Sequence, residues 1–250
     1  MGVAVVGFST GALEKGDFRR AIDWIKRGQP EAIELSALRF EELQPLVDAI
    51  DSVAVEEIEY VSFHAPSSFQ KEQESQVVEL LSRVFERGWN IVVHPDVIYT
   101  PSLWLKFKEQ LLVENMDRRK AIGRTAFELS KIFEELPEAR LCLDVAHARN
   151  LDTTLGVLRD IVRQFAGRIA EIHISELDSR CQHRPLSAGA IKDYQRFSSV
   201  LRGIPVIIES VLDGHHESQR LKEVELAKES MAEYVPAYKD AYAGDRGVAG

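Results

Sequence analysis

Eight short apolar runs alternate with amphipathic runs along the chain, and this alternation restricts the fold more than any other feature of the sequence. The apolar runs lie at 3–8, 32–36, 59–64, 90–94, 111–115, 141–145, 170–175 and 205–210. Between them, residues 77–85 and 157–165 place apolar side chains at intervals of three and four, which predicts helices. Strands that alternate with helices form a parallel sheet, either closed into a (β/α)8 barrel or open and doubly wound.

An ionisable side chain lies at or near the end of each of the last six apolar runs. These residues are His64, His94, Glu114, Asp144, His173 and Glu209. The carboxyl ends of barrel strands meet on one face, where catalytic residues lie, whereas an open sheet would spread the same residues along an edge. The sequence therefore predicts a single (β/α)8 TIM barrel, an α/β fold, over residues 1–235, with a C-terminal tail at 236–250.

Composition restricts the partners and the compartment. The formal net charge of −9 argues against a protein that wraps nucleic acid by bulk electrostatics. The two cysteines, Cys142 and Cys181, indicate no disulfide framework and favour a reducing compartment. We find neither a signal peptide nor an apolar stretch near the roughly 20 residues that span a bilayer. We therefore expect a cytoplasmic protein that does not enter a membrane.

Imidazoles and carboxylates gathered at one rim predict a metal centre. His147 and His183 follow the sixth and seventh apolar runs in the predicted loops, and they add two more imidazoles. Such ligands suit zinc, manganese or iron, and a divalent ion would remove the repulsion between the carboxylates. A lone histidine is more often a core residue, and Asp144 alone is as well explained as a helix N-cap. The coincidence of six such residues on consecutive strands favours metal binding.

With these residues, the sequence resembles the xylose-isomerase-like TIM-barrel superfamily over about residues 3–233. That superfamily includes sugar isomerases and epimerases, and the metal-dependent apurinic/apyrimidinic endonucleases. The resemblance implies one metal ion held by four residues from successive strands. These are Glu114, Asp144, His173 and Glu209.

The His-Pro pair at 94–95 and the Glu-Asn pair at 114–115 are similar to the endonuclease branch. This similarity implies that His64 and His94 bind a further ion together with Glu114, which bridges to the ion of the quartet. A third ion would take His147 and His183.

The third position departs from the endonuclease pattern. Cys181 stands where that branch has an aspartate, two residues before His183. A thiolate is a good zinc ligand, so Cys181 is predicted as a candidate. Two alternatives stay open at this point: Asp178 replaces it, or the position holds no ion.

Three functions follow from these predictions. Two or three ions would activate water and stabilise the attacking and leaving oxygens of a phosphoester hydrolase that acts on a small sugar phosphate or nucleotide-like substrate. With one ion, Glu114 and Glu209 would instead shuttle a proton in a sugar isomerase or epimerase. The third class is a barrel that binds metal or sugar without turnover. We expect zinc as the metal, with manganese as the alternative.

Four further positions are candidates for contact with an anionic or sugar substrate or for support of the site. Arg118 lies in the segment ENMDRRK, and with Arg119, Lys120 and the nearby Arg124 it belongs either to a solvated helix start or to a phosphate-binding loop. Arg184 follows His183, and Glu34 is predicted at the end of the second strand, lining the mouth or forming a salt bridge. Glu171 shares a strand face with His173 and is a candidate to support it from below.

Overall fold

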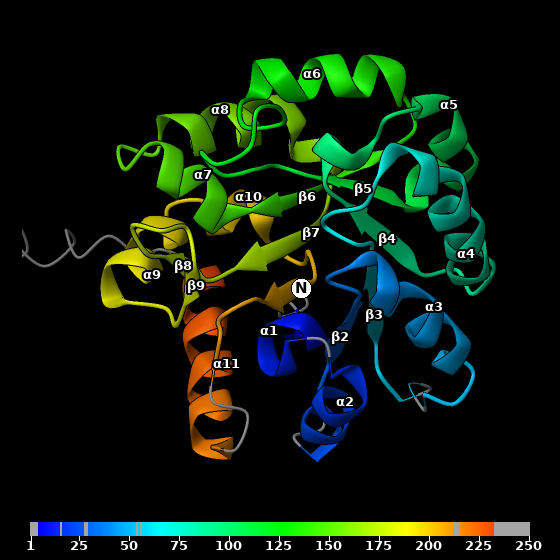
Figure 1. Ribbon diagram of the computed structural model, residues 1–250. Coiled ribbons are helices and arrows are strands. Elements are labelled where there is room, and N and C mark those ends of the chain that lie inside the picture. Colours follow the sequence, from blue (N-terminus) through cyan, green and yellow to red (C-terminus); the bar gives the residue numbers. More distant parts are fainter. Residues whose placement is uncertain are drawn as a thin grey trace, which may run out of the picture.

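The structure is a computed structural model, and it describes residues 5–15, 17–27, 30–53, 55, 57–212 and 216–232. Eight parallel strands close into a barrel, because β1 pairs with both β2 and β10 (Figure 1). The barrel strands are β1 (Val6–Ser9), β2 (Ala32–Ser36), β3 (Tyr60–His64), β4 (Asn90–Val93), β5 (Leu111–Glu114), β6 (Arg140–Asp144), β7 (Ile169–Ile174) and β10 (Val206–Ile208). The predicted TIM barrel is confirmed.

The strands begin and end close to the predicted residues. The largest differences are at β1, which starts at Val6, and at β10, which ends at Ile208. As a result Glu209 follows its strand directly, as His94 follows β4. The predicted domain end at residue 235 and the predicted tail at 236–250 lie outside the described residues.

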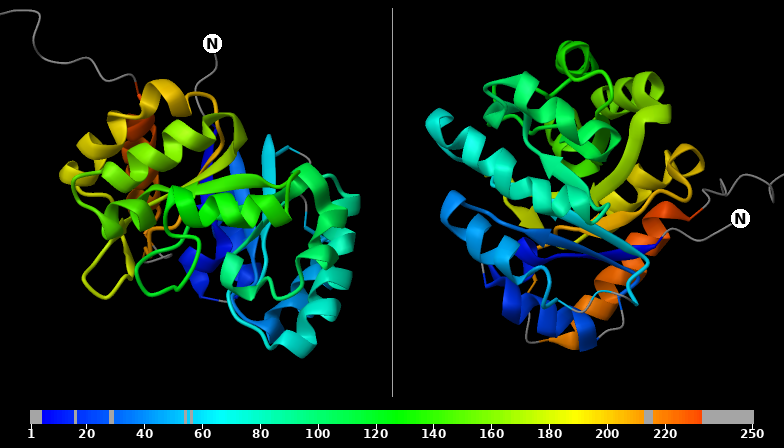
Figure 2. Two further views of the ribbon diagram at one scale, coloured as in Figure 1. Left: turned by 90° about the horizontal axis from the view of Figure 1, so that it is seen from above. Right: turned by 90° about the vertical axis from the view of Figure 1, so that its right-hand side faces the viewer.

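Helices surround the barrel on its outside, as the three views of Figures 1 and 2 show. The α-helices are α1 (Thr10–Glu14), α2 (Phe18–Arg27), α3 (Phe40–Ala49), α4 (Glu74–Glu86), α5 (Pro101–Trp104), α6 (Ala126–Glu135), α7 (Val145–Leu151), α8 (Gly156–Phe165), α9 (Ala188–Gln195), α10 (Ser198–Leu201) and α11 (Glu217–Met231). Short 3-10 helices are η1 (Lys71–Gln73), η2 (Pro95–Val97), η3 (Leu105–Gln110) and η4 (Ala166–Arg168). α4 and α8 match the two predicted helical patterns. None of the described helices is long and apolar enough to cross a membrane.

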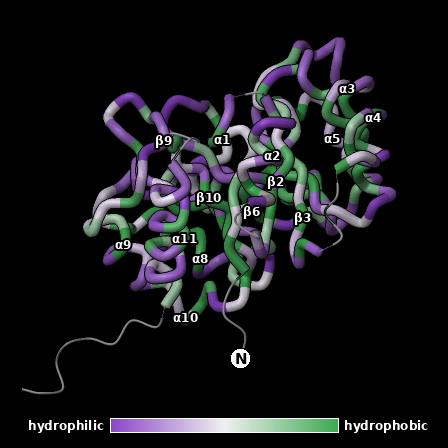
Figure 3. Tube along the Cα trace, turned by 90° about the horizontal axis from the view of Figure 1, so that it is seen from below, coloured by the Kyte–Doolittle hydropathy of each residue, from purple (hydrophilic) through white to green (hydrophobic). Residues whose placement is uncertain are grey.

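Among the described residues, the buried apolar side chains form two clusters. The larger one includes residues of both strands and helices, among them the fully buried Trp104, Phe63 and Leu81, and hydrophobic segments gather toward the middle of the molecule in Figure 3. The smaller cluster consists of Val92, Leu112, Cys142 and Ala170. Three of its members precede His94, Glu114 and Asp144 by two positions, so they face the same side of their strands. This apolar layer lies directly below the ionisable rim.

A small antiparallel hairpin, which the sequence patterns did not predict, interrupts the order of the barrel. Its strands are β8 (Glu176–Leu177) and β9 (His183–Arg184), and Leu177 pairs with His183. Asp178 stabilises the turn by accepting hydrogen bonds from the backbone N–H groups of Arg180 and Gln182. The hairpin thereby fixes the position of His183 above the carboxyl end of β7.

Candidate metal centre

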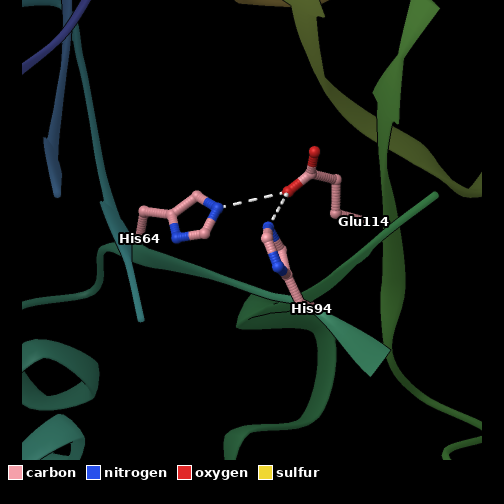
Figure 4. A group of neighbouring side chains, drawn as sticks. All are labelled: His64, His94 and Glu114. Atoms are coloured by element: carbon pink, nitrogen blue, oxygen red, sulfur yellow. Dashed lines mark hydrogen bonds and ion pairs between the residues drawn. The ribbon is translucent and has the colours of Figure 1, made fainter. Parts of the chain in front are cut away.

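Glu114, the last residue of β5, lies at the centre of the ionisable rim. Its Oε2 atom is 3.2 Å from Nε2 of His64 and 3.1 Å from Nε2 of His94, and both rings point toward this carboxylate in Figure 4. Its Oε1 atom is 3.1 Å from Nδ1 of His147 and 3.8 Å from Nδ1 of His173. The two oxygens of one carboxylate therefore face two different groups of possible ligands.

The second group contains the four residues that the family resemblance implied as a quartet. One ligand atom each from Glu114, Asp144, His173 and Glu209 lies within 4.8 Å of the other three. Nδ1 of His173 is 3.4 Å from Oε1 of Glu209. The first three side chains are buried, whereas Glu209 is 16% exposed, so the quartet is open to solvent on the Glu209 side.

Asp144 combines the two roles that its sequence position predicted as alternatives. Its Oδ1 atom accepts the backbone N–H of His147 at 2.7 Å and so caps α7. Its Oδ2 atom faces the rim, 3.4 Å from Nδ1 of His147. The capped turn brings His147 back over the strand end, where it forms a third group with Asp144 and His183. The Asp-x-x-His spacing is thus the spacing of one capped helical turn.

Cys181 lies in the turn of the β8–β9 hairpin with a positive φ of 56°. Its side chain is buried, and its Sγ is 3.4 Å from Oδ1 of Asn150. The third group contains Asp144 rather than Cys181. Zinc binding by Cys181 stays a prediction.

The donor set suits a divalent ion. Oδ2 of Asp144 and Nδ1 of His173 are buried and have no hydrogen-bond partner among the described residues. Buried polar atoms are nearly always paired, so ligand atoms that face one another without a protein partner are the donors that a cation would take. The buried histidine, glutamate and aspartate clusters therefore indicate a metal site, and its metal would be held by these clusters.

Burial and neighbouring charges shift the pKa values of the rim residues in opposite directions. Burial raises the pKa of Asp144 to about 8. Burial would also raise the pKa of Glu114, but the surrounding imidazoles, His94 first, lower it well below its usual value. Burial opposes the charged form of His64 and His147, yet nearby carboxylates raise their pKa values to about 9 and about 10. In the metal-free protein, protons on these imidazoles balance the carboxylates.

A second layer of polar side chains lies below the rim and orients His173. Nε2 of His173 is 2.8 Å from Oε1 of Glu171 and 3.1 Å from Oε2 of Glu34, and all three side chains are fully buried. Tyr60 donates to Oε2 of Glu171 at 2.6 Å, and Asn90 donates to the Tyr60 oxygen at 2.9 Å. Because two carboxylates lie within hydrogen-bond distance of Nε2, the proton of the neutral ring is favoured on Nε2. The unprotonated Nδ1 then directs its lone pair toward Glu114 and Glu209.

Replacement of Glu171 by alanine is expected to weaken metal binding by about 10- to 100-fold, because His173 loses one of the acceptors that hold its ring. Tyr60→Phe is the matched control, since it removes the donor to Glu171 and the acceptor of Asn90 but leaves the Glu171 carboxylate beside His173, and it should have a smaller effect. Competition with a chromophoric chelator measures both affinities. Unchanged affinity in Glu171→Ala would show that Glu34 alone orients His173.

The structure shows the surroundings of the three predicted substrate contacts, Glu34, Arg118 and Arg184. Glu34 lies two residues below the strand end and is buried against His173, so it is the salt-bridge partner rather than a residue of the mouth. Arg118 donates to the backbone oxygen of Ser179. Arg184 is held by Asp178 at 2.7 Å. Neither arginine lines the cleft over the rim. Direct substrate contact by Arg118 and Arg184 stays a prediction.

The cleft over the rim has a volume of about 540 Å³, and of the cations in the segment ENMDRRK it is lined by Arg119 and Lys120. The segment ENMDRRK is not a solvated helix start, because residues 118–125 form turns and bends and α6 begins at Ala126. Within it Asp117 is 1% exposed, a position that the sequence interpretation missed. Its neighbouring cations made this aspartate look like a surface residue, and no periodic pattern indicated otherwise.

No protein-family model and no curated protein matches the sequence. Solved structures do match. Endonuclease IV from Thermus thermophilus has a TM-score of 0.62 at 19% identity, with 91% of this chain and 100% of that chain covered. The 3-keto-D-glucoside 4-epimerase of E. coli has a TM-score of 0.54 at 13% identity, covering 90% and 97%. A xylose isomerase-like TIM-barrel protein from Mycobacterium smegmatis, solved with magnesium, has a TM-score of 0.56 at 10% identity, covering 87% and 90%.

At these identities the likeness concerns the fold alone, and it agrees with the resemblance seen in the sequence. The closed barrel and these comparisons lead to one conclusion: the chain has the TIM-barrel fold, and its structural neighbours include an endonuclease IV, a sugar epimerase and a xylose isomerase-like TIM-barrel protein.

Proposed function

We propose that the chain is a metal-dependent hydrolase of small phosphoesters, with a sugar phosphate or a nucleotide-like molecule as substrate. The observation that carries this proposal is the position of Glu114 between two ligand groups. Its Oε2 faces His64 and His94, and its Oε1 lies on the side of His147 and His173. A carboxylate shared in this way would hold two ions side by side, which is the arrangement used for displacement at phosphorus.

The ions would supply activation of water and stabilisation of the attacking and leaving oxygens. The protein side chains would hold the ions and move protons. His64, His94 and His147 surround Glu114 and keep its carboxylate ionised. Glu209 lines the cleft and is the most exposed carboxylate of the quartet, so it is the residue proposed to accept or deliver a proton at the substrate.

The cleft supports a small substrate. Its volume of about 540 Å³ fits a ligand of the size of a sugar phosphate or nucleotide. The net charge of −9 does not favour an extended nucleic acid. Imidazole and carboxylate ligands favour zinc as the resident metal, with manganese as the alternative.

A sugar isomerase or epimerase is the second candidate, favoured by one feature of the cleft. Hydroxyl-bearing residues line it beside the ionisable rim, namely Ser9, Ser36, Ser67 and Ser68. Such residues suit the hydroxyls of an unphosphorylated sugar. In that case the quartet would hold a single ion, and Glu114 and Glu209 would move a proton between neighbouring carbons.

Metal stoichiometry distinguishes the two proposals. Protein purified without chelator is expected to contain two or three ions per chain by mass spectrometry of the metals, and its phosphoesterase activity should disappear with chelator and return with zinc. Small phosphodiesters and sugar phosphates are the first substrates to test, with ketose–aldose pairs as the competing class. About one ion per chain, together with turnover of an unphosphorylated ketose, would replace the hydrolase by the isomerase.

A further inference from the structure

Two cations line the wall of the cleft next to β5, and each is held by a carboxylate that is outside the metal clusters. Arg119 is held by Asp117, and Lys120 is held by Asp96, whose Oδ2 accepts from Nζ at 2.6 Å. Both cations line the same cleft as His94, His147 and the other rim residues. The anchoring carboxylates therefore point cations toward the place where the substrate would bind.

The geometry of Arg119 is that of an oriented guanidinium. Its Nε donates to both oxygens of Asp117, at 3.1 and 2.9 Å, and its Nη2 donates to Oδ2 of the same residue. Asp117 also accepts the backbone N–H of Arg119 at 2.7 Å, which closes a tight local turn. The Nη1 group has no partner within the described part of the chain, and the Arg119 side chain is 53% exposed toward the cleft.

Asp117 connects this guanidinium to the metal centre. Its carboxylate is 1% exposed, and its Oδ2 lies 3.8 Å from Nε2 of His147, the residue whose Nδ1 contacts Glu114. A buried carboxylate that only closed a surface turn would not need to lie between an imidazole of the rim and a guanidinium. Its position sets the distance between the cation and the clusters, so both would act on one substrate.

We infer that Arg119, held by Asp117 and assisted by Lys120, forms an oxyanion subsite for the phosphate group of the substrate. The identity of the substrate rests on the proposed function, whereas binding of phosphate to the subsite can be tested without it. A guanidinium with a free N–H edge suits phosphate or carboxylate. Lys120 beside it adds ammonium N–H donors to the same wall of the cleft, which suits the three terminal oxygens of a phosphate group better than the two of a carboxylate.

Inorganic phosphate is the probe, titrated calorimetrically into the protein as purified, with its metal content measured. Arg119→Ala is expected to raise the dissociation constant for phosphate by about 10-fold or more, since charge-assisted hydrogen bonds are lost. Arg119→Lys should give an intermediate dissociation constant, because lysine keeps the positive charge but lacks the planar pair of N–H donors of the guanidinium. Arg124→Ala is the matched control, because Arg124 lies in the same loop, pairs with Glu128 and does not line the cleft.

Equal metal content in all variants shows that the clusters are intact. Phosphate binding that is unchanged in Arg119→Ala, or absent from wild-type protein with full metal content, would overturn the inference. Acetate that binds as tightly as phosphate would overturn the assignment to phosphate. Arg119-dependent phosphate binding without any phosphoester turnover would refute the proposed hydrolase and leave the subsite standing.

Discussion

Glu114→Gln is expected to release ions from both ligand groups that meet at Glu114, and therefore to lower the metal content by more than one ion per chain. The amide keeps the shape of the side chain but removes the negative charge between His64, His94 and His147. A carboxylate offers one oxygen to each ion, whereas an amide offers a single neutral oxygen and an NH2 group that cannot bind metal, so glutamine cannot bridge two ions. Mass spectrometry of the metals, on protein purified without chelator, measures the loss.

His94→Ala is the matched control for this prediction. His94 contacts Oε2 of Glu114 and belongs only to the first group, so its removal should empty one position and leave the quartet occupied. Phosphoesterase activity should fall in both variants, because the proposed reaction uses both positions. Full metal content in Glu114→Gln would show that Glu114 does not bridge, and the proposed hydrolase would lose its main support.

Much of the fold and rim could be predicted because strands and their polar ends leave local patterns. Runs of β-branched residues identify barrel strands, and an ionisable residue that ends such a run, like Asp144, must face either the rim or the next helix. In this structure it does both. These are properties of consecutive residues, so they can be read without knowledge of the tertiary structure.

The height of a residue within the barrel could not be read in the same way. The sequence leaves Glu34 either at the mouth or in a salt bridge, and the register of β2 decides between them: it pairs Ser36 with His64, so Ser36 reaches the rim and Glu34 lies one layer below. Register depends on the stagger between neighbouring strands, which only the closed barrel defines. The same limit applies to Asp117, whose burial results from contacts with Arg119 and His147 across a loop of turns.

Gly7→Ala is expected to disturb the closure of the barrel. Gly7 is in β1 and pairs with Ala32 of β2 on one side and Ile207 of β10 on the other. A Cβ added at Gly7 would lie 1.7 Å from the backbone oxygen and 2.2 Å from the carbonyl carbon of Ala32. The backbone of a paired strand cannot move aside as a flexible side chain can, so the hydrogen bonds between β1 and β2 must open.

We expect Gly7→Ala to lower the free energy of unfolding by at least about 3 kcal/mol, as overpacking against fixed backbone does in severe cases. Gly167→Ala is the control: a Cβ there meets no atom within 4 Å, so its effect should stay within about 1 kcal/mol and be stabilising in sign. Urea unfolding of metal-free protein measures both without a contribution from ion binding. If the two alanine variants unfold at the same midpoint, β1 and β2 are not held as closely as their register requires. The pairing of β1 with β2 would then be loose beside Ser9 and Ser36, which line the cleft.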